Sequence, residues 1–261
     1  MRYLQIALCL FAVILLPGCS SDSAKTGSFE VLLQEIIHEL KTIQQLLASQ
    51  DSTQFPILEQ LAEQGDAKAQ WELGATYRDG QDVPPDYQKA YAWFQKAAEQ
   101  GNVSAQNSLG VMYLLGQGIP IDHPKAFEWF QKAAEQGYPS AQFNLGRMYW
   151  SGKSVSRDEQ KAVEWLQKAA EQGLSSAQFR LGYIYKSGKG IPRDEQKAFK
   201  WFDKAAFHGQ VSAIHAVGEM LCSGIGTTKD MVSGCDNLLY AIELGFAPAI
   251  DSYNKYCIQN N

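Results

Sequence analysis

The chain's candidates for chemistry are a serine–lysine motif, four histidines and five cysteines. Ser252-Tyr253-Asn254-Lys255 has the S-x-x-K spacing of a serine acylation site, and the same serine also fits S-x-N. One serine cannot serve both motifs, and the matching K-T-G element, Lys25-Thr26-Gly27, lies in a small polar stretch near the N-terminus. We therefore expect no catalytic residues here.

The histidines share no metal-binding interval. His38, His123, His208 and His215 do not stand beside carboxylates or thiols at the spacings that zinc sites use. Glycine-rich stretches such as Gly188-Lys189-Gly190 follow a turn and no strand precedes them, which does not support a phosphate-binding loop. We expect neither a metal nor a cofactor.

Cys19 follows what looks like an export signal. Arg2 precedes an apolar run over residues 4–16, which is too short to span a membrane. The next residues, Leu16-Pro17-Gly18-Cys19, resemble the lipobox of bacterial lipoproteins, and that resemblance implies cleavage before Cys19 and acylation of its amine and sulfur. Ser20, rather than aspartate, implies the outer membrane of a Gram-negative cell envelope, facing the periplasm. The alternative is a plain signal peptide with an incidental cysteine.

The charge balance bears on possible partners. The chain has 23 basic and 28 acidic residues, a net charge of -5 and a sequence pI near 5.4. Proteins that bind nucleic acid need a basic surface to neutralise phosphates, so we expect no nucleic-acid partner.

Glycines spaced 36 residues apart show that the chain is built from repeats, which predicts a solenoid whose units bury their cores against their neighbours. Within each unit a first helix is expected to end at a glycine, and a second to begin after an aspartate that caps its first turn. The period glycines are Gly65, Gly101, Gly137, Gly173, Gly209 and Gly245. The helix-ending glycines are Gly80, Gly116, Gly152, Gly188 and Gly224, and the capping aspartates are Asp86, Asp122, Asp158, Asp194 and Asp230.

The repeat unit resembles a known family. Ala141 to Gly152 has the pattern A-x-x-x-L-G-x-x-Y-x-x-G, and Lys161 to Ala170 has K-A-x-x-W-[FL]-x-K-A-A. Both are similar to the Sel-one-like repeat (SLR), a relative of the tetratricopeptide repeat. The resemblance implies an all-α fold, an α-α solenoid forming a right-handed superhelix of 36-residue two-helix repeats, whose concave face is lined by the first helices. The fifth unit departs from the pattern, as a terminal capping unit would.

The chain then divides into five parts. Residues 1–18 are the expected lipoprotein signal peptide, 19–28 a tether, 29–64 leading helices and an N-terminal cap, 65–244 five SLR repeats, and 245–261 a C-terminal capping helix. The stripe of leucine and isoleucine over residues 29–47 is expected to cover the first repeat. A homodimeric coiled coil through residues 29–47 is the alternative.

A partner-binding groove is predicted on the first helices, at positions that the repeat pattern leaves variable. Aromatic and apolar residues stand there beside arginine, a composition typical of interaction hot spots. Some of these rings would alternatively pack between adjacent first helices. The predicted groove residues are Trp71, Asn107, Leu114, Phe143, Asn144, Arg147, Trp150, Phe179, Arg180, Tyr183 and Lys186.

Three cysteines remain in the C-terminal units after export and lipidation. An oxidising compartment favours one disulfide and one free thiol. Cys222 ends one expected helix and Cys235 opens the next, so we favour a Cys222–Cys235 disulfide, with Cys235–Cys257 as the alternative.

The expected function is that of a lipid-anchored, non-enzymatic adaptor or scaffold that binds a peptide or protein partner in the concave groove. Two alternatives stay open. One is a structural spacer that self-associates through the leading helix. The other is a weak β-lactamase or penicillin-binding activity, which the resemblance implies because some cysteine-rich family members are associated with it.

Overall fold

The computed structural model describes residues 55–81 and 83–258, and every regular element in that part of the chain is helical. The expected signal peptide, lipidation site Cys19, tether and 29–47 stripe lie outside the described residues. Residues 55–63 are helical and precede α3. Within the described residues, no helix combines the length and the apolar character needed to cross a membrane.

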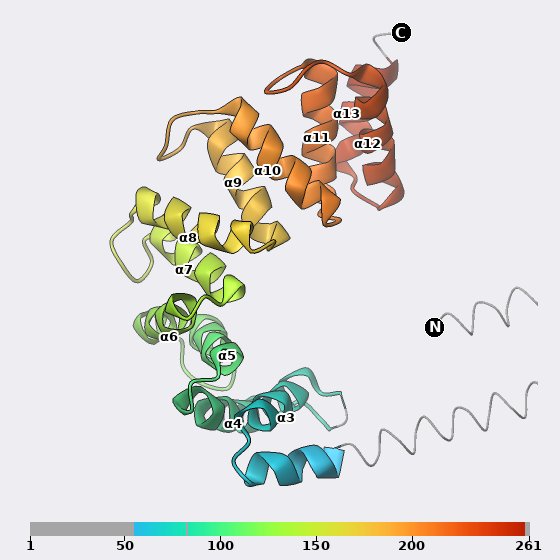
Figure 1. Cartoon of the computed structure of the whole chain (residues 1–261). Coiled ribbons are helices and arrows are strands. Elements are labelled where there is room, and N and C mark those ends of the chain that lie inside the picture. Colours follow the sequence, from blue (N-terminus) through green and yellow to red (C-terminus); the bar gives the residue numbers. More distant parts are fainter. Residues whose placement is uncertain (1–54, 82, 259–261) are drawn as a thin grey trace, which may run out of the picture. The chain divides into compact units, whose positions relative to one another are not determined.

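The helices from α3 to α12 all have the same length, and they form successive pairs of a first and a second helix. Each packs mainly against the helix before it and the helix after it (Figure 1). The structure is therefore an α-α solenoid. The first helices of the successive pairs are α3 (Ala67–Asp79), α5 (Val103–Leu115), α7 (Pro139–Ser151), α9 (Ser175–Ser187) and α11 (Val211–Ser223). The second helices are α4 (Tyr87–Glu99), α6 (His123–Glu135), α8 (Glu159–Glu171), α10 (Glu195–Phe207) and α12 (Met231–Glu243), and α13 (Pro248–Tyr253) and the π-helix η1 (Asn254–Ile258) follow.

The helix boundaries confirm the predicted signals. All five first helices end at their glycine in the left-handed conformation, which only glycine adopts without steric cost. All five second helices begin after their aspartate, whose carboxylate accepts a backbone N–H from the first turn. The backbone N–H bonds lower the pKa of Asp122, Asp158 and Asp194, and the Ser233 hydroxyl, followed by the Ser233 N–H, lowers that of Asp230.

One apolar side chain of each second helix fills the core of its pair, where it packs against a glycine of the first helix. Phe130 is fully buried, and a Cβ on Gly110 would lie 2.6 Å from its Cδ1 atom. The adjacent tryptophan does not fill this gap, because Trp129 is only half-buried and Lys132 Nζ lies 4.3 Å from its ring centre. The core residues at this position are Phe94, Phe130, Leu166, Phe202 and Leu238.

Buried glutamines tie three successive helices together. Gln142 of α7 donates through Nε2 to the carbonyl oxygen of Ala134 in α6, at 3.3 Å. Its Oε1 accepts a hydrogen bond from Nε2 of Gln172, which follows α8, at 2.8 Å. The same pair of bonds recurs in the two preceding units, and we name these contacts the glutamine ladder. The ladder consists of Gln70 with Gln100, Gln106 with Gln136, and Gln142 with Gln172.

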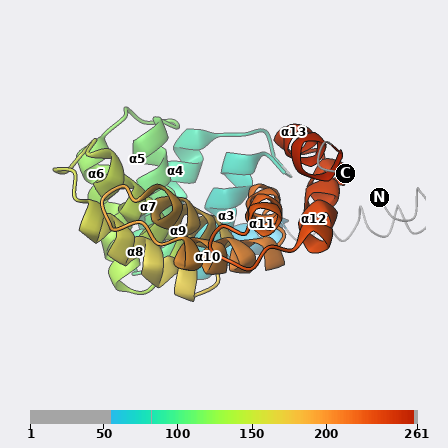
Figure 2. The same cartoon turned by 90° about the horizontal axis from the view of Figure 1, so that it is seen from above.

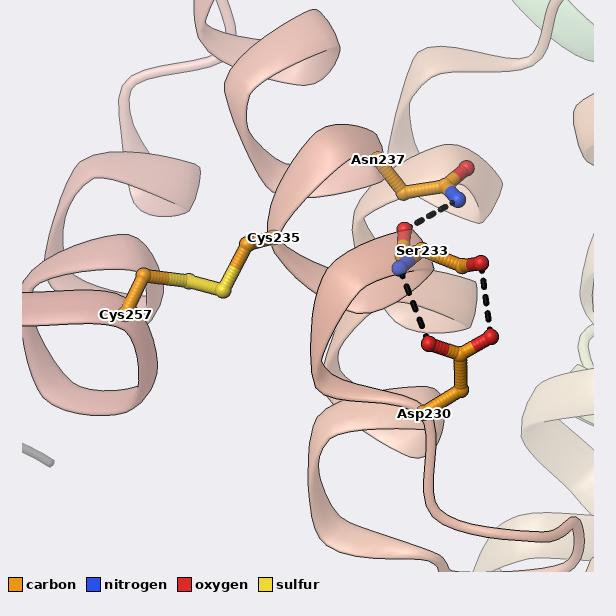
Figure 3. Close-up of a disulfide and its surroundings, with 5 residues drawn as sticks. All are labelled: Asp230, Ser233, Cys235, Asn237 and Cys257. Atoms are coloured by element: carbon orange, nitrogen blue, oxygen red, sulfur yellow. Dashed lines mark hydrogen bonds between the residues drawn. A yellow bond between two sulfur atoms is a disulfide. The ribbon is translucent and has the colours of Figure 1, made fainter. Parts of the chain in front are cut away.

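The C-terminal unit corrects the favoured disulfide. Cys235 of α12 pairs with Cys257 of η1, and Cys222 at the end of α11 remains a buried free thiol. The reason is that η1 folds back onto α12 and brings the Cys257 sulfur to Cys235. Figure 3 shows this bond between the two helical segments.

Candidate partner-binding site

Neighbouring first helices meet through side chains that are 37 residues apart. Trp71 Nε1 of α3 donates to Ser108 Oγ of α5 at 3.3 Å, and Asn144 Nδ2 of α7 donates to Asn107 Oδ1 of α5 at 3.1 Å. These hydrogen bonds close the surface between α3, α5 and α7. The predicted groove residues Trp71, Asn107 and Asn144 are therefore engaged with one another's helices.

At the equivalent contact between α7 and α9, the residues are Phe143 and Arg180 in place of the two polar pairs. Here the surface opens into a hollow of about 370 Å³, which we call the α7–α9 hollow. Figure 1 shows α7 and α9 as the first helices of consecutive pairs. The hollow is lined by Phe143, Ser176, Phe179, Arg180, Tyr183 and Gln210.

The hollow has rigid apolar walls and one accessible ring. Phe143 is half-buried against the α8–α9 core, and Phe179 is half-buried against the α10–α11 core and lies 5.5 Å from the Phe202 ring. Tyr183 is 48% exposed. The packing therefore holds the two phenylalanine rings in place while the tyrosine ring remains available for contact.

Two arginines beside the hollow differ from the other arginines of the described residues in their ion pairing. Of the five arginines there, Arg78, Arg157 and Arg193 pair with a carboxylate. Arg147 and Arg180 have no carboxylate partner among the described residues.

Both of these arginines lie against aromatic rings. The Arg180 guanidinium carbon lies 5.7 Å from the centre of the Trp150 ring, and that of Arg147 lies 5.7 Å from the centre of the Phe143 ring. The Arg180 Nε atom is buried, with no hydrogen-bond partner in the described residues. Cationic and apolar groups thus lie side by side at the hollow, and the planar guanidinium favours a planar anion such as a carboxylate.

The remaining predicted groove residues lie outside the hollow. Leu114 is half-buried against the α6–α7 core, and Trp150 packs against the α8–α9 core under Arg180 and Arg157. Lys186 Nζ lies 3.9 Å from Glu219 Oε2 of α11. Part of the predicted groove is therefore packing between repeats, as in the alternative interpretation.

A polar cluster joins α11 to α13. Ser252 Oγ lies 2.9 Å from His215 Nε2 and donates to Glu219 Oε1 at 2.9 Å. Burial lowers the pKa of His215, although the Glu219 carboxylate acts in the opposite direction. The Ser252 hydroxyl thus donates a hydrogen bond to the Glu219 carboxylate, and together with His215 it joins α13 to α11.

Sequence reasoning missed several of these residues. Ser176 and Gln210 line the hollow, Ser108 accepts the hydrogen bond from α3, and Ser252, considered in the sequence only as part of a serine–lysine motif, joins α13 to α11. The 37-residue spacing could have identified Ser108 and Ser252. A side chain at one position of a repeat contacts the side chain one position further along in the next repeat.

Comparisons with known proteins agree with this architecture. The chain is similar to the crystal structure of a Sel1 repeat protein from Oxalobacter formigenes, with 31% identity and a TM-score of 0.69 over 72% of this chain and 77% of that one. It is also similar to a sel1 repeat protein from Klebsiella pneumoniae subsp. pneumoniae, with 29% identity and a TM-score of 0.52 over 77% of this chain and 98% of that one. No match was found among curated proteins.

A more distant likeness concerns the fold alone. Immunity protein Pa5087 from Pseudomonas aeruginosa is 22% identical, with a TM-score of 0.51 over 75% of each chain. The Sel1 repeat itself matches five consecutive segments of this chain, at residues 67–102, 103–138, 139–174, 175–209 and 211–246. The chain belongs to the Sel1 repeat family.

Proposed function

We propose that this protein is a scaffold that binds a segment of a partner protein across α7 and α9, with one partner side chain seated in the α7–α9 hollow. Sel1 repeat proteins typically mediate protein–protein interactions, which supports a role of this general kind. The proposal assigns no catalytic step to the chain.

The observation that carries the proposal is the pair of arginines without carboxylate partners beside an aromatic hollow. Arg147 and Arg180 have no carboxylate partner among the described residues, in a chain whose net charge is -5. Charge complementarity at an interface selects the partner and speeds association. The partner segment is therefore acidic beside the residue that enters the hollow.

The walls of the hollow indicate the nature of the inserted residue. Phe143, Phe179 and Tyr183 present ring surfaces, and the volume of about 370 Å³ is at the lower end of the roughly 300–1,000 Å³ of ligand pockets. Such a space fits a single large apolar or aromatic side chain. Because the phenylalanine rings are already fixed by packing, little side-chain entropy is lost on binding.

Fluorescence anisotropy with two labelled decapeptides tests this chemistry. The peptides have the same length and the same tryptophan, and they differ only in carrying aspartate or lysine around it. We expect the aspartate peptide to bind about tenfold or more tightly than the lysine peptide, and to weaken as salt is raised. Equal affinity for the two peptides, or no binding of either, would contradict the proposed partner chemistry.

Charge reversal in the protein provides the matched test. The double substitution Arg147→Glu with Arg180→Glu should lower affinity for the aspartate peptide by about tenfold or more. Arg78→Glu with Arg193→Glu is the charge-matched control, because Arg78 and Arg193 already pair with Asp79 and Glu195 and neither lines the hollow. A comparable loss in both variants would show that the effect comes from net charge rather than from the site.

The proposal also includes attachment to the outer membrane, facing the periplasm, through acylated Cys19. Its support is the lipobox-like sequence Leu16-Pro17-Gly18-Cys19. Acylation would keep the scaffold at the membrane and raise its effective concentration near partners there. Metabolic labelling with a fatty-acid analogue should mark the wild-type chain and not Cys19→Ser. Equal labelling of both chains, or of neither, would exclude this anchor.

A further inference from the structure

Three sulfur atoms meet where α11, α12 and η1 pack together. The sulfurs of Cys222, Cys235 and Cys257 all lie within 4.8 Å of one another. Cys235 and Cys257 form the disulfide in Figure 3, and Cys222 is a thiol that is only 2% exposed. A thiol this close to both sulfur atoms of a disulfide has the proximity that thiol–disulfide exchange requires.

The helices fix this arrangement. Cys222 packs against α12 at Gly234, where a Cβ atom would collide with its Sγ atom. The neighbouring units carry alanine at this position, so the glycine provides the space that the thiol occupies. The first turn of α12 is held by Asp230, which accepts hydrogen bonds from the backbone N–H and the hydroxyl of Ser233, as Figure 3 shows. The position of Cys235 relative to Cys222 is therefore built into the helix packing.

We propose that Cys222, Cys235 and Cys257 form an intramolecular thiol–disulfide exchange site that transfers the free thiol from Cys222 to Cys257. The Cys222 thiolate attacks Cys235 Sγ, a Cys222–Cys235 bond forms and the Cys235–Cys257 bond breaks. Cys257 leaves as a thiolate and takes up a proton. One disulfide and one thiol exist before and after the step, so it needs neither an oxidant nor a reductant.

The exchange changes where a reactive thiol is found. Cys222 is buried, whereas Cys257 lies half-buried in η1, near the C-terminal end of the described residues. After exchange the thiol is therefore closer to solvent, and no disulfide links η1 to α12. The product is a site for S-alkylation or for mixed-disulfide formation with a small disulfide.

The environment of Cys222 controls the rate of the exchange. Only the thiolate attacks, and burial raises the pKa of Cys222. Lys229 acts in the opposite direction, while the Glu219 and Asp230 carboxylates reinforce the increase. The exchange should therefore be slow near neutral pH and accelerate as the pH rises.

Trapping of the folded, oxidised full chain with iodoacetamide tests the proposal. At pH 8.5 the reagent should accumulate on Cys257, together with an equal amount of the Cys222–Cys235 disulfide, both identified by peptide mapping after an acid quench. Because alkylation is irreversible, even a minor exchanged population accumulates. The rate of Cys257 labelling should increase severalfold between pH 7 and pH 8.5. Circular dichroism confirms that the chain stays folded throughout.

Cys222→Ser is the matched control, because it retains the Cys235–Cys257 disulfide and lacks the attacking thiol. It should show no labelling of Cys257 over the same period. Labelling of Cys257 in this variant would show that the disulfide opens without Cys222, which overturns the proposal. Labelling of Cys222 alone, or no labelling at all, in the wild-type chain overturns it as well.

Discussion

The repeats from α3 to α8 and the C-terminal unit from α11 to η1 use different chemistry at equivalent places. In the repeats, buried glutamines link each first helix to the helices on both sides. In the C-terminal unit Ile214 replaces the glutamine, and the Cys235–Cys257 disulfide and the His215–Ser252–Glu219 cluster connect the last elements. A ladder needs a neighbour on each side, whereas a disulfide closes a terminal unit by itself.

The change begins one unit earlier, at His208. The ladder would place a glutamine there to donate to Gln178 Oε1, and that oxygen is instead buried without a hydrogen-bond partner in the described residues. Gln178 keeps its other bond, from Nε2 to the Ala170 carbonyl oxygen at 3.0 Å. The ladder therefore ends with one unsatisfied acceptor rather than with a complete replacement.

The largest expected effect comes from the apolar core that both regions share. Phe130→Ala removes a fully buried ring from the α5–α6 pair and should lower the free energy of unfolding by about 3–5 kcal/mol. Its neighbour Trp129 is half-buried, and Trp129→Ala should cost about 1 kcal/mol. Urea denaturation followed by circular dichroism measures both. Equal losses would show that the tryptophan row contributes to the core as much as the phenylalanine does.

The second effect comes from giving a middle repeat the residue of the C-terminal unit. Gln142→Ile imitates Ile214 and removes two hydrogen bonds, the one to the Ala134 carbonyl and the one from the Gln172 amide. Both groups keep other partners, because the Ala134 carbonyl also accepts from the Gly137 N–H and the Gln172 amide also donates to the Gly137 carbonyl. At about 0.5–1.5 kcal/mol for each lost bond, we expect a loss of about 1–3 kcal/mol. Gln167→Ala is the control, because Gln167 bonds only to Glu171 on an exposed surface. A loss no larger than that of the control would show that the ladder adds nothing to stability.

The third effect has the opposite sign. His208→Gln should supply the missing donor to Gln178 Oε1 and raise the free energy of unfolding by about 1 kcal/mol. The double variant His208→Gln with Gln178→Leu provides the comparison, because it lacks the acceptor. If His208→Gln stabilises the chain equally with and without the Gln178 side chain, the gain comes from helix propensity rather than from the ladder.

The regular part of the fold could be predicted because each repeat restates the same local signals. Gly152 ends α7 through its left-handed backbone conformation, and Asp158 caps the first turn of α8. Both signals depend on neighbouring residues only. The core position was harder to assign. Trp165 and Leu166 are adjacent on α8, and only the close approach of Gly146 shows that Leu166 faces inward.

The site and the disulfide could be predicted only in part, because both depend on contacts between units. The composition of the first helices identified Phe143, Phe179, Arg180 and Tyr183, which line the hollow. It did not separate them from Asn107 and Asn144, which bond to each other across helices. The favoured Cys222–Cys235 pairing was wrong for a similar reason, because the fold-back of η1 onto α12 has no counterpart in the repeat pattern.

The smallest expected effect is a pH dependence confined to the C-terminal unit. Burial, together with Lys186 of α9, lowers the pKa of His215 below its ordinary value of 6.5, while Glu219 opposes the change. The unfolded chain therefore binds a proton more readily than the folded one. The stability contributed by neutral His215 is complete above pH 6.5 and is lost as the pH falls through the lowered pKa.

His215→Asn should accordingly flatten the dependence of unfolding free energy on pH between about 7.5 and 5. The carboxyl groups of Asp122, Asp158, Asp194 and Asp230 do not obscure this window, because their pKa values are lowered from 3.8. Urea titrations of the two chains at several pH values measure the difference. A steeper dependence in the variant would mean that the Glu219 carboxylate outweighs burial and favours protonated His215. The α11–α13 contact would then be a charge pair, unlike the neutral glutamine contacts of the repeats.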